Sequence, residues 1–470
     1  MAVLDAAQSD VGIIGLDTTG RKVALRLAER QFNVTACDWG RPSAPATNEL
    51  TAGPGARVAA SVSELMASAR PPRIILIFSG AETPMNLVLD QLLPGLKQED
   101  LVIDAGDSYF KDTAMHGRRL ARSHIPFIGL GLAGAEKEAP HGAIVMAGGG
   151  GEALHRARPL LEGMAATVRG EPCVSCFETP AAAHFVKMVH AGIEYALLQL
   201  LSETFDLLQR TLLLTDEELH DPSGAWHIGV LNGYLMEISG RVFEPVDQQT
   251  PRLLLEEKLQ SAKNDALGKW VTRSAWELGV PVPTIEAAAG TQRVPGAERR
   301  QALLAAPYRQ PAGRFGDDSG SVLDELHGAL HAAMMITYAQ GMALLIAASK
   351  DLGFQFKLDE ISRAWRGCAH LRTTLLEDIT NALQATPDLP GLLSDDDLSE
   401  GVMACQERLR HAVWRAHQLD FVVPALLASL DYLDSNREAW LPVNLIQVSS
   451  PQPAATAFSM DLDGLIEEPS

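Results

Sequence analysis

Basic residues are scarce in this sequence. The 470 residues include 39 Lys and Arg but 59 Asp and Glu, which gives a formal net charge of −20 at pH 7. A chain with this excess of negative charge repels the phosphates of nucleic acids and the surfaces of anionic membranes. We therefore expect a soluble protein with neither a nucleic-acid nor a membrane partner.

Cysteines are also few, and their wide scatter does not fit a disulfide framework. Cys173 and Cys176 have the spacing of a redox or zinc pair, but no second pair and no nearby histidine completes a zinc site. We interpret the cysteines as ordinary thiols and expect no metal site. The five cysteines are Cys37, Cys173, Cys176, Cys368 and Cys405.

The sequence shows neither a signal peptide nor a clear membrane span. Residues 1–10 lack the basic and apolar regions of a secretory signal. The most apolar segment, residues 329–348, is interrupted by His331, Tyr338 and Gln340, which favours a buried core helix over a transmembrane helix. We predict a cytoplasmic location.

The chain contains enough apolar sequence for more than one core. Apolar residues make up 46% and charged residues 21%, as in folded globular proteins. The N-terminal part alternates short apolar runs with helical patterns, which predicts a parallel, doubly wound α/β sheet. The predicted strands are 11–15, 33–37, 74–78, 101–104 and 126–129, and residues 148–151 are predicted to form a loop.

The strand pattern stops beyond that region. Segments such as 181–209 and 322–349 have helical periodicity with few breaking residues, which predicts a large all-α domain. The chain loses this periodicity near its C-terminus. We therefore divide it into an α/β domain at 1–178, an all-helical domain at 179–440 and a C-terminal tail at 441–470.

The first predicted strand runs into Gly15-Leu16-Asp17-Thr18-Thr19-Gly20, which has the spacing of a dinucleotide-binding loop. In such a loop the glycines let the backbone approach a pyrophosphate, which binds at the helix N-terminus. Gly15 and Gly20 are therefore candidate cofactor-binding residues. Asp17 occupies the central small position, where a carboxylate would crowd and repel the pyrophosphate.

Asp38 ends the second predicted strand and is a further candidate cofactor-binding residue. An acid at this place accepts hydrogen bonds from the ribose hydroxyls of NAD and repels the 2′-phosphate of NADP. The alternative is a turn aspartate that precedes Trp39-Gly40-Arg41-Pro42. The pattern leaves both interpretations open.

One predicted helix carries a possible base and acid on the same face. Lys187, His190 and Glu194 lie at positions i, i+3 and i+7 among apolar residues. Burial lowers the pKa of a lysine and raises that of a glutamate, which suits them to general base and general acid roles. The alternative is a Lys–Glu ion pair on the rim of the helix.

A series of motifs spread over about residues 10–447 resembles the 6-phosphogluconate dehydrogenase family. The most specific segments are the helix that carries Lys187 and Glu194, and a motif near the C-terminus. The matching motifs are Val11-Gly12-Ile13-Ile14-Gly15, Gly170-Glu171-Pro172-Cys173-Val174, Val186-Lys187-Met188-Val189-His190, Gly192-Ile193-Glu194-Tyr195, Gly268-Lys269-Trp270, Tyr338-Ala339-Gln340-Gly341 and Leu441-Pro442-Val443-Asn444-Leu445-Ile446-Gln447.

The resemblance implies a Rossmann-type domain, a large helical domain and a tail that reaches into the partner subunit of a homodimer. The implied reaction is the NADP-dependent oxidation of 6-phosphogluconate, a sugar acid, and its decarboxylation to ribulose 5-phosphate. It makes Lys187 the base that takes the 3-hydroxyl proton and Glu194 the acid that protonates the enediol. His190 and Tyr195 would bind the substrate.

Other positions depart from the family pattern. Anionic or apolar side chains replace the small, polar or basic residues that the family uses for its ligands. A charged hydrogen bond to a phosphate contributes about 1.5–3 kcal/mol, so several losses together weaken binding strongly. The departing segments are Asp17, Asp38-Trp39-Gly40, Phe78, Ala105-Gly106-Asp107, Leu132-Ala133-Gly134-Ala135, Ala191, Asp265-Ala266-Leu267-Gly268 and Thr291-Gln292.

We therefore expect activity on 6-phosphogluconate to be weakened or lost. One alternative is an active dehydrogenase with a different hydroxy-acid substrate and a preference for NAD. Another is a non-catalytic dimeric scaffold or ligand sensor, which includes a heterodimer with a competent paralogue.

Overall fold

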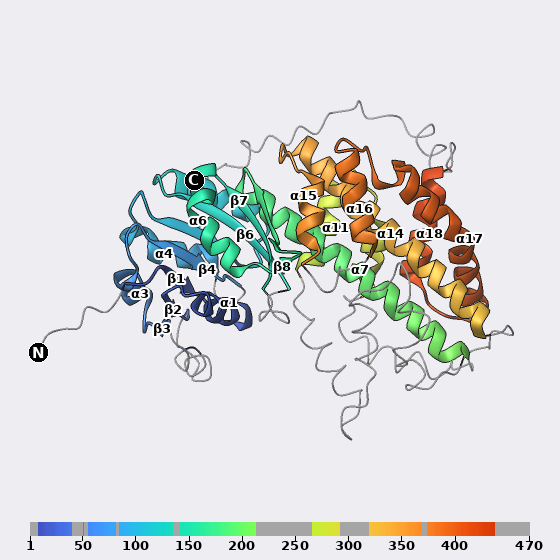
Figure 1. The fold of residues 1–470 in the computed structure, drawn as a ribbon, viewed down its shortest axis with the longest axis horizontal. Helices are drawn as coiled ribbons and strands as arrows, with labels where there is room; N and C mark the ends of the chain where they lie inside the picture. The colour runs from blue at the N-terminus through green and yellow to red at the C-terminus, as the bar shows by residue number, and fades with distance from the viewer. Residues whose placement is uncertain are drawn as a thin grey trace, which may run out of the picture.

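The computed structural model describes residues 8–39, 50, 55–80, 84–134, 142–212, 266–291, 319–367 and 374–437. Two bodies lie side by side, a sheet domain coloured blue to teal and a helical domain coloured green to red (Figure 1). Cys368, Asp265, Gln292 and the predicted tail at 441–470 lie outside the described residues.

The sheet domain is built on eight strands in the order β10-β7-β6-β5-β4-β1-β2-β3. All neighbouring strands pair in parallel except β6 and β7, which are antiparallel. The strands are β1 Val11–Ile14, β2 Val34–Cys37, β3 Ala56–Val58, β4 Ile74–Ile77, β5 Leu101–Asp104, β6 Phe127–Ala133, β7 Ile144–Gly149 and β10 Val174–Phe177, and a separate ribbon pairs β8 Thr167–Val168 with β9 Glu171–Pro172.

Helices cover both faces of this sheet because its central strands are apolar on both sides. Leu76 of β4 packs toward one face, while its neighbours Ile75 and Ile77 pack toward the other. The doubly wound α/β fold is therefore confirmed. The first face is covered by α1 Thr18–Glu29 and α6 Gly151–Met164, and the second by α3 Val62–Ser68, α4 Met85–Leu92 and the end of α5 Phe110–Ala121.

The sequence prediction of a loop at 148–151 was wrong except at Gly150. Gly148 and Gly149 form the end of β7, and α6 begins at Gly151. A Cβ atom at Gly148 would lie 2.1 Å from the carbonyl oxygen of Thr179, so glycine lets the following segment cross close to the strand. The run of glycines therefore reflects close backbone packing as well as a turn.

A single long helix, α7 Pro180–Leu212, connects the sheet to the helical domain. Its first turns contact β6 and β7, and its later turns contact α12 and α14 (Figure 1). The other described helices of this domain are α11 Leu267–Glu277, α12 Pro283–Thr291, α14 Ser319–Asp351, α15 Leu358–Trp365, α16 Thr374–Ala385, α17 Asp396–Gln418 and α18 Pro424–Arg437.

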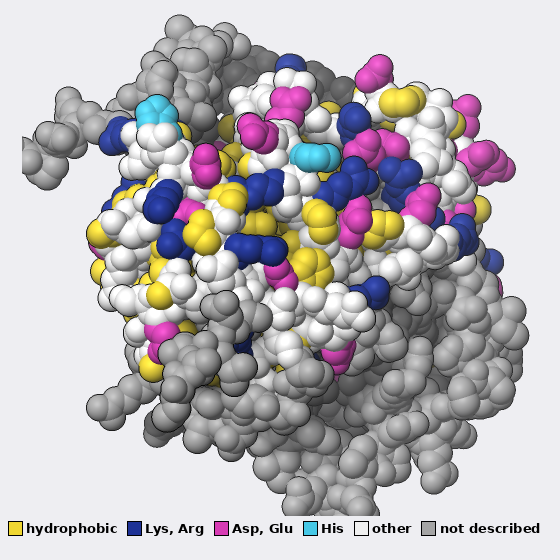
Figure 2. Space-filling model, turned by 60° about the vertical axis from the view of Figure 1, so that its left-hand side comes forward, with side chains coloured by type: hydrophobic (Ala, Val, Ile, Leu, Met, Phe, Trp, Pro, Cys, Tyr) yellow, Lys and Arg dark blue, Asp and Glu magenta, His cyan; other side chains and the backbone are white. Residues whose placement is uncertain are grey.

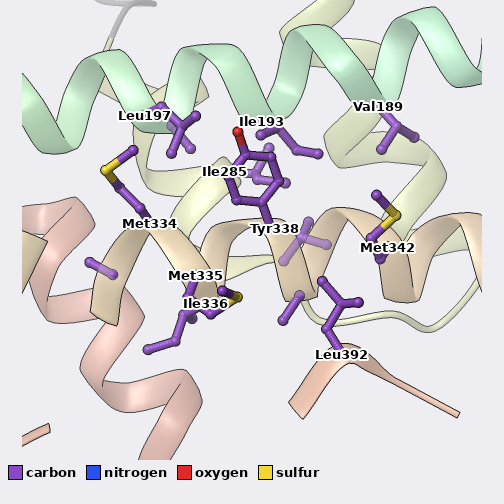
Figure 3. Close-up of a cluster of buried hydrophobic side chains, with 14 of the residues drawn as sticks. Val189, Ile193, Leu197, Ile285, Met334, Met335, Ile336, Tyr338, Met342 and Leu392 are labelled. Carbon is purple, nitrogen blue, oxygen red and sulfur yellow. The ribbon is translucent and has the colours of Figure 1, made fainter. Parts of the chain in front are cut away.

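The core of the helical domain forms where α7 packs on α14. Val189, Ile193 and Leu197 repeat every four residues along α7 and face Tyr338 of α14 (Figure 3). Gly341 allows the close approach, because a Cβ there would lie 2.5 Å from Cδ1 of Ile193. The contact fixes α7 along its length, which is how the helix can present a rigid face to the sheet.

The apolar segment predicted as a core helix lies in α14. This helix contains an 18-residue window, within Gly320–Asp351, with mean hydropathy 1.5, apolar enough to cross a membrane, but 78% of it is buried inside the protein. Gln340 is fully buried, and its side-chain amide bonds Thr284 of α12 through both its nitrogen and its oxygen, at 2.8 and 3.1 Å. These contacts match a core helix, since the polar group is satisfied by the neighbouring helix.

Candidate active site

A cavity of about 260 Å³ lies where α7 crosses the carboxyl ends of the sheet strands. Ligands of open α/β sheets bind at this edge, outside the ends of the strands. The sheet contributes the loops after β1, β4, β5 and β6 to the wall, and the helical domain contributes α7 and Leu267 of α11. Both domains therefore build the cavity.

The three residues of the predicted helix face line this cavity, together with Tyr195, which the family resemblance added. Lys187, His190, Glu194 and Tyr195 project from successive turns of α7. The side chain of His190 is 1% exposed, and its Nδ1 lies 4.0 Å from Oε2 of Glu194. The ring of Trp365 contacts the His190 ring edge-on at a centroid distance of 5.4 Å, which fixes the imidazole. The sequence pattern thus identified side chains that share one site.

A glycine in the sheet brings the helix face into position. Gly131 lies in β6, directly beneath Lys187, and a Cβ at Gly131 would lie 2.8 Å from Cβ of Lys187. Any larger residue would push α7 away from the sheet. The close approach places Lys187 against the β5–α5 loop.

The ammonium group of Lys187 pairs with a carboxylate from that loop. Its Nζ donates a hydrogen bond to Oδ1 of Asp107, and the Lys187 side chain is only 12% exposed, whereas that of Asp107 is 66% exposed. The positive charge of Lys187 lowers the pKa of Asp107. The sequence analysis had considered an ion pair between Lys187 and Glu194 on the rim of the helix. In the structure Lys187 instead pairs with Asp107, which lies 80 residues away in the chain.

The glycine loop after β1 has the backbone of a tight turn. Gly15 has φ of +97°, and a Cβ at Gly20 would lie 2.1 Å from the carbonyl oxygen of Gly15. Asp17 caps α1, since its Oδ1 accepts a hydrogen bond from the backbone N–H of Gly20 at 2.7 Å. The carboxylate of Asp17 therefore already accepts the hydrogen bond of the Gly20 N–H, which an anionic ligand would otherwise use as a donor.

Partial burial raises the pKa of Asp17, an effect opposed by the Gly20 hydrogen bond and reinforced by the negative charge of Asp107. Lys187 acts in the opposite direction. The charges of the glycine loop, the β5–α5 loop and α7 therefore influence one another across a single cavity.

Asp38 follows β2 and contacts the same glycine loop. Its Oδ1 accepts hydrogen bonds from the backbone N–H groups of Leu16 at 3.3 Å and Trp39 at 3.0 Å. The turn interpretation accounts for these bonds. They also hold the carboxylate beside the loop, where the interpretation as a ribose acceptor requires it.

Comparison with known proteins agrees with this architecture. Residues 10–177 match the NAD binding domain of 6-phosphogluconate dehydrogenase, and residues 183–450 match its C-terminal domain. The NADP(+)-dependent, decarboxylating 6-phosphogluconate dehydrogenase of Bacillus subtilis is 34% identical over 447 residues, or 94% of each chain. The chain belongs to the 6-phosphogluconate dehydrogenase family. The decarboxylating enzyme of Escherichia coli is 33% identical over 449 residues, again 94% of each chain.

The resemblance seen in the motifs is thus confirmed, and a solved structure supports the fold of this 6-phosphogluconate dehydrogenase family member. The Plasmodium falciparum 6-phosphogluconate dehydrogenase, solved alone and in complex with NADP+ and 6-phosphogluconate, matches with a TM-score of 0.85 at 26% identity. The match covers 93% of this chain and 95% of that one. The predicted Rossmann-type domain and large helical domain are therefore confirmed.

In this family member the rest of the cavity wall is largely apolar. Phe78, Leu132, Ala133, Ala191 and Leu267 all line it. Ala133 and Ala191 stand at positions where the sequence departs from the family pattern, and neither side chain can hydrogen-bond a carboxylate or a hydroxyl. Apart from Lys187, His190 and Tyr195, the side-chain donors among the described lining residues are the hydroxyls of Thr19 and Ser79.

Sequence reasoning missed the polar groups beneath the cavity floor. Asp104 is fully buried and accepts hydrogen bonds from the Ser108 hydroxyl at 2.8 Å and the Gly106 N–H at 3.1 Å, which shapes the loop that carries Asp107. His184, one turn before Lys187, lies with its Nδ1 2.8 Å from the hydroxyl of Thr113, and burial lowers its pKa. The position of Asp104 at the end of a predicted strand was a signal that could have identified it.

The described residues contain no group of three or more His, Cys, Asp or Glu side chains that could hold a metal ion. No disulfide joins the cysteines of the described residues, which are Cys37, Cys173, Cys176 and Cys405.

The surface of the sheet domain does not form a uniformly acidic face. Seen from that end of the molecule, Lys and Arg side chains lie interspersed with Asp and Glu (Figure 2). Some form exposed ion pairs, such as Arg70 with Asp10 and Arg158 with Glu162. The charges that bear on ligand choice are those inside the cavity.

Proposed function

We propose that this chain is a dehydrogenase-type member of the family whose activity on 6-phosphogluconate is weakened or lost. The ion pair between Lys187 and Asp107 carries the proposal. Nζ of Lys187 already donates a hydrogen bond to Asp107, so the nitrogen that a base would direct at a substrate hydroxyl is engaged by a neighbouring carboxylate. The same carboxylate also repels an anionic substrate.

The retained groups support a hydroxy-acid reaction at this site. Lys187 would take the proton of a substrate hydroxyl, and Glu194 would return a proton to carbon after the loss of carbon dioxide. His190 and Tyr195 would orient the substrate between them, since they lie on the same side of α7. These roles follow the positions that the family uses and agree with the convergence of the four side chains.

A nicotinamide dinucleotide fits the glycine loop in part. Gly15 and Gly20 form the tight turn that a dinucleotide loop uses, and Asp38 beside this loop would accept a hydrogen bond from a ribose hydroxyl. Asp17 opposes this fit because its carboxylate holds the Gly20 N–H. The dinucleotide would supply the hydride acceptor. We propose weak binding with NAD preferred to NADP, although the Bacillus subtilis relative is named for NADP(+).

An altered hydroxy-acid substrate is the second candidate. The intact base and acid positions and the formed cavity favour it, since a scaffold would not need them. The homodimer, a heterodimer with a paralogue and the cytoplasmic location stay predictions.

Steady-state assays of the purified full chain test the proposal. Reduction of NADP and of NAD is followed at 340 nm with 6-phosphogluconate, and a Lys187→Ala variant serves as the control. We expect the two proteins to give the same rate or rates that differ weakly. Robust turnover that disappears in Lys187→Ala would show that activity on 6-phosphogluconate is intact.

A further inference from the structure

We propose that this cavity takes an alcohol with an ammonium group on the carbon next to the hydroxyl, and without a phosphate. A vicinal amino polyol acid has this chemistry, because its own ammonium group offsets the charge of its carboxylate. The inference rests on the proposed function, because it takes Lys187 as the group that meets the substrate hydroxyl.

The charge balance of the described wall is the first argument. Asp17, Asp107 and Glu194 line the cavity with carboxyl groups, and Lys187 is the one lysine or arginine among the lining residues. Lys187 is already paired with Asp107. A further anion would find no free cation among these residues, whereas a cation would find carboxylates.

The second argument concerns what releases Lys187. When Nζ of Lys187 turns from Asp107 to a substrate hydroxyl, Asp107 loses its ion-pair partner while the negative charge of Asp17 still acts on it. The loss of this partner costs little because the side chain of Asp107 is 66% exposed, but a ligand phosphate placed there would be repelled by the carboxylate. A ligand ammonium instead takes the place of Nζ at Asp107. Binding of such a ligand therefore leaves Nζ of Lys187 available to the substrate hydroxyl.

Geometry sets where the ammonium must lie. A hydroxyl hydrogen-bonded to Nζ of Lys187 lies within about 5–6 Å of Asp107, because two hydrogen bonds through Nζ span that distance. An amino group on the neighbouring carbon falls between the hydroxyl and Asp107. An amino group at the far end of the chain would lie too far away to reach it.

The remaining wall agrees with a ligand that lacks a phosphate at this end. Ala133 and Ala191 offer no side-chain donors, and Phe78 and Leu267 present hydrocarbon. Gly20 N–H, the amide at the helix N-terminus, is held by Asp17. An anionic group thus gains little from these residues, while carbon-bound hydrogens of a polyol can pack against them.

Calorimetry with three matched probes tests the inference on the full chain. The probes are 2-amino-2-deoxygluconate, gluconate, which has a hydroxyl in place of the amino group, and 6-phosphogluconate. Each is titrated with and without NAD, and Asp107→Asn is compared with Asp112→Asn. The second variant removes the same charge from an exposed position outside the cavity lining.

We expect the amino probe to bind at least about tenfold more tightly than gluconate, and Asp107→Asn, but not Asp112→Asn, to reduce that ratio to about one. The inference is overturned if the amino probe does not bind, if gluconate or 6-phosphogluconate binds as tightly, or if Asp107→Asn keeps the preference. Turnover of 6-phosphogluconate is read in a separate assay. If 6-phosphogluconate is turned over robustly while the amino probe still binds more tightly than gluconate, the proposed function is rejected but the inferred ligand class is not.

Discussion

Asp107 of the sheet domain forms an ion pair with Lys187 of the helical domain across the cavity between them. The pair joins the loop after β5 to the face of α7 that carries the family's base and acid positions. It also neutralises the one lysine or arginine among the described residues of the cavity lining. Asp17 faces the same cavity from the glycine loop and Glu194 faces it from α7, so three carboxyl groups and one lysine are the charged groups of the described lining.

Asp17→Ala should strengthen the binding of NAD and NADP by about tenfold. The change removes a negative charge and frees the Gly20 N–H for a pyrophosphate. It should also lower the free energy of unfolding by about 1 kcal/mol, because a helix cap is lost. Calorimetry measures the first effect and urea unfolding the second. Ser61→Ala is the matched control, since Ser61 caps α3 in the same way through the Glu64 N–H at 3.2 Å.

Stronger dinucleotide binding in Ser61→Ala would mean that the effect is not specific to the glycine loop. Micromolar affinity of the unmutated protein for NADP would contradict the repulsion by Asp17.

Asp107→Asn should lower the free energy of unfolding at neutral pH. The difference between the variant and the unmutated protein should become smaller in acid. Lys187 lowers the pKa of Asp107 in the folded state. The pair therefore contributes above about pH 4, the ordinary range of an aspartate, and its contribution is lost as pH falls through the lower folded pKa. The effect should stay below about 1 kcal/mol because the side chain of Asp107 is 66% exposed.

Urea unfolding of the protein and the variant between pH 3 and pH 7 measures this difference. Asp388→Asn, at an exposed position, should show no such dependence. A difference that is constant with pH would indicate a steric cause rather than the ion pair.

Glu203→Gln should destabilise the helical domain by about 1–3 kcal/mol. Glu203 is 4% exposed, and its two carboxylate oxygens accept the N–H groups of Ala425 and Leu426 at 2.9 and 3.0 Å, where α18 begins. A glutamine has only one acceptor oxygen, so its side-chain NH2 group would face one of these two N–H donors. Chemical denaturation measures the loss, with exposed Glu400→Gln as control.

Burial raises the pKa of Glu203, so its titration favours the folded state below the unfolded pKa of about 4.3, and that contribution is lost as pH rises through the folded pKa. Glu203→Gln should remove this part of the pH dependence. If Glu203→Gln and the unmutated protein were equally stable at pH 7, the result would contradict the role of Glu203 as the acceptor for the N–H groups at the start of α18.

The protein should be a homodimer in solution. Trp276 on α11 is 83% exposed and Trp414 on α17 is 57% exposed, and large aromatic side chains gain from burial in an interface. Multi-angle light scattering of the full chain should give twice the 50.5 kDa of one chain. A monomer at micromolar concentration would refute the prediction.

Much of the fold could be predicted from local sequence patterns. The strands β1, β2, β4, β5 and β6 appeared as short apolar runs, and α7 and α14 as long periodic segments. The strands β3, β7 and β10 were missed, because β3 is short and β7 ends in glycines that resemble a loop. Their place in the sheet depends on partners that are distant in the chain.

The sequence by itself determined the family, the alternation of strands and helices, and the alignment of Lys187, His190 and Glu194 on one helix face. Each of these follows from spacing along a regular backbone. Only the tertiary structure decided that Lys187 pairs with Asp107, 80 residues away, and that Asp17 turns its carboxylate onto its own helix. Such contacts depend on which strand ends become neighbours in the sheet and on how closely Gly131 lets α7 approach, and no local pattern contains that information.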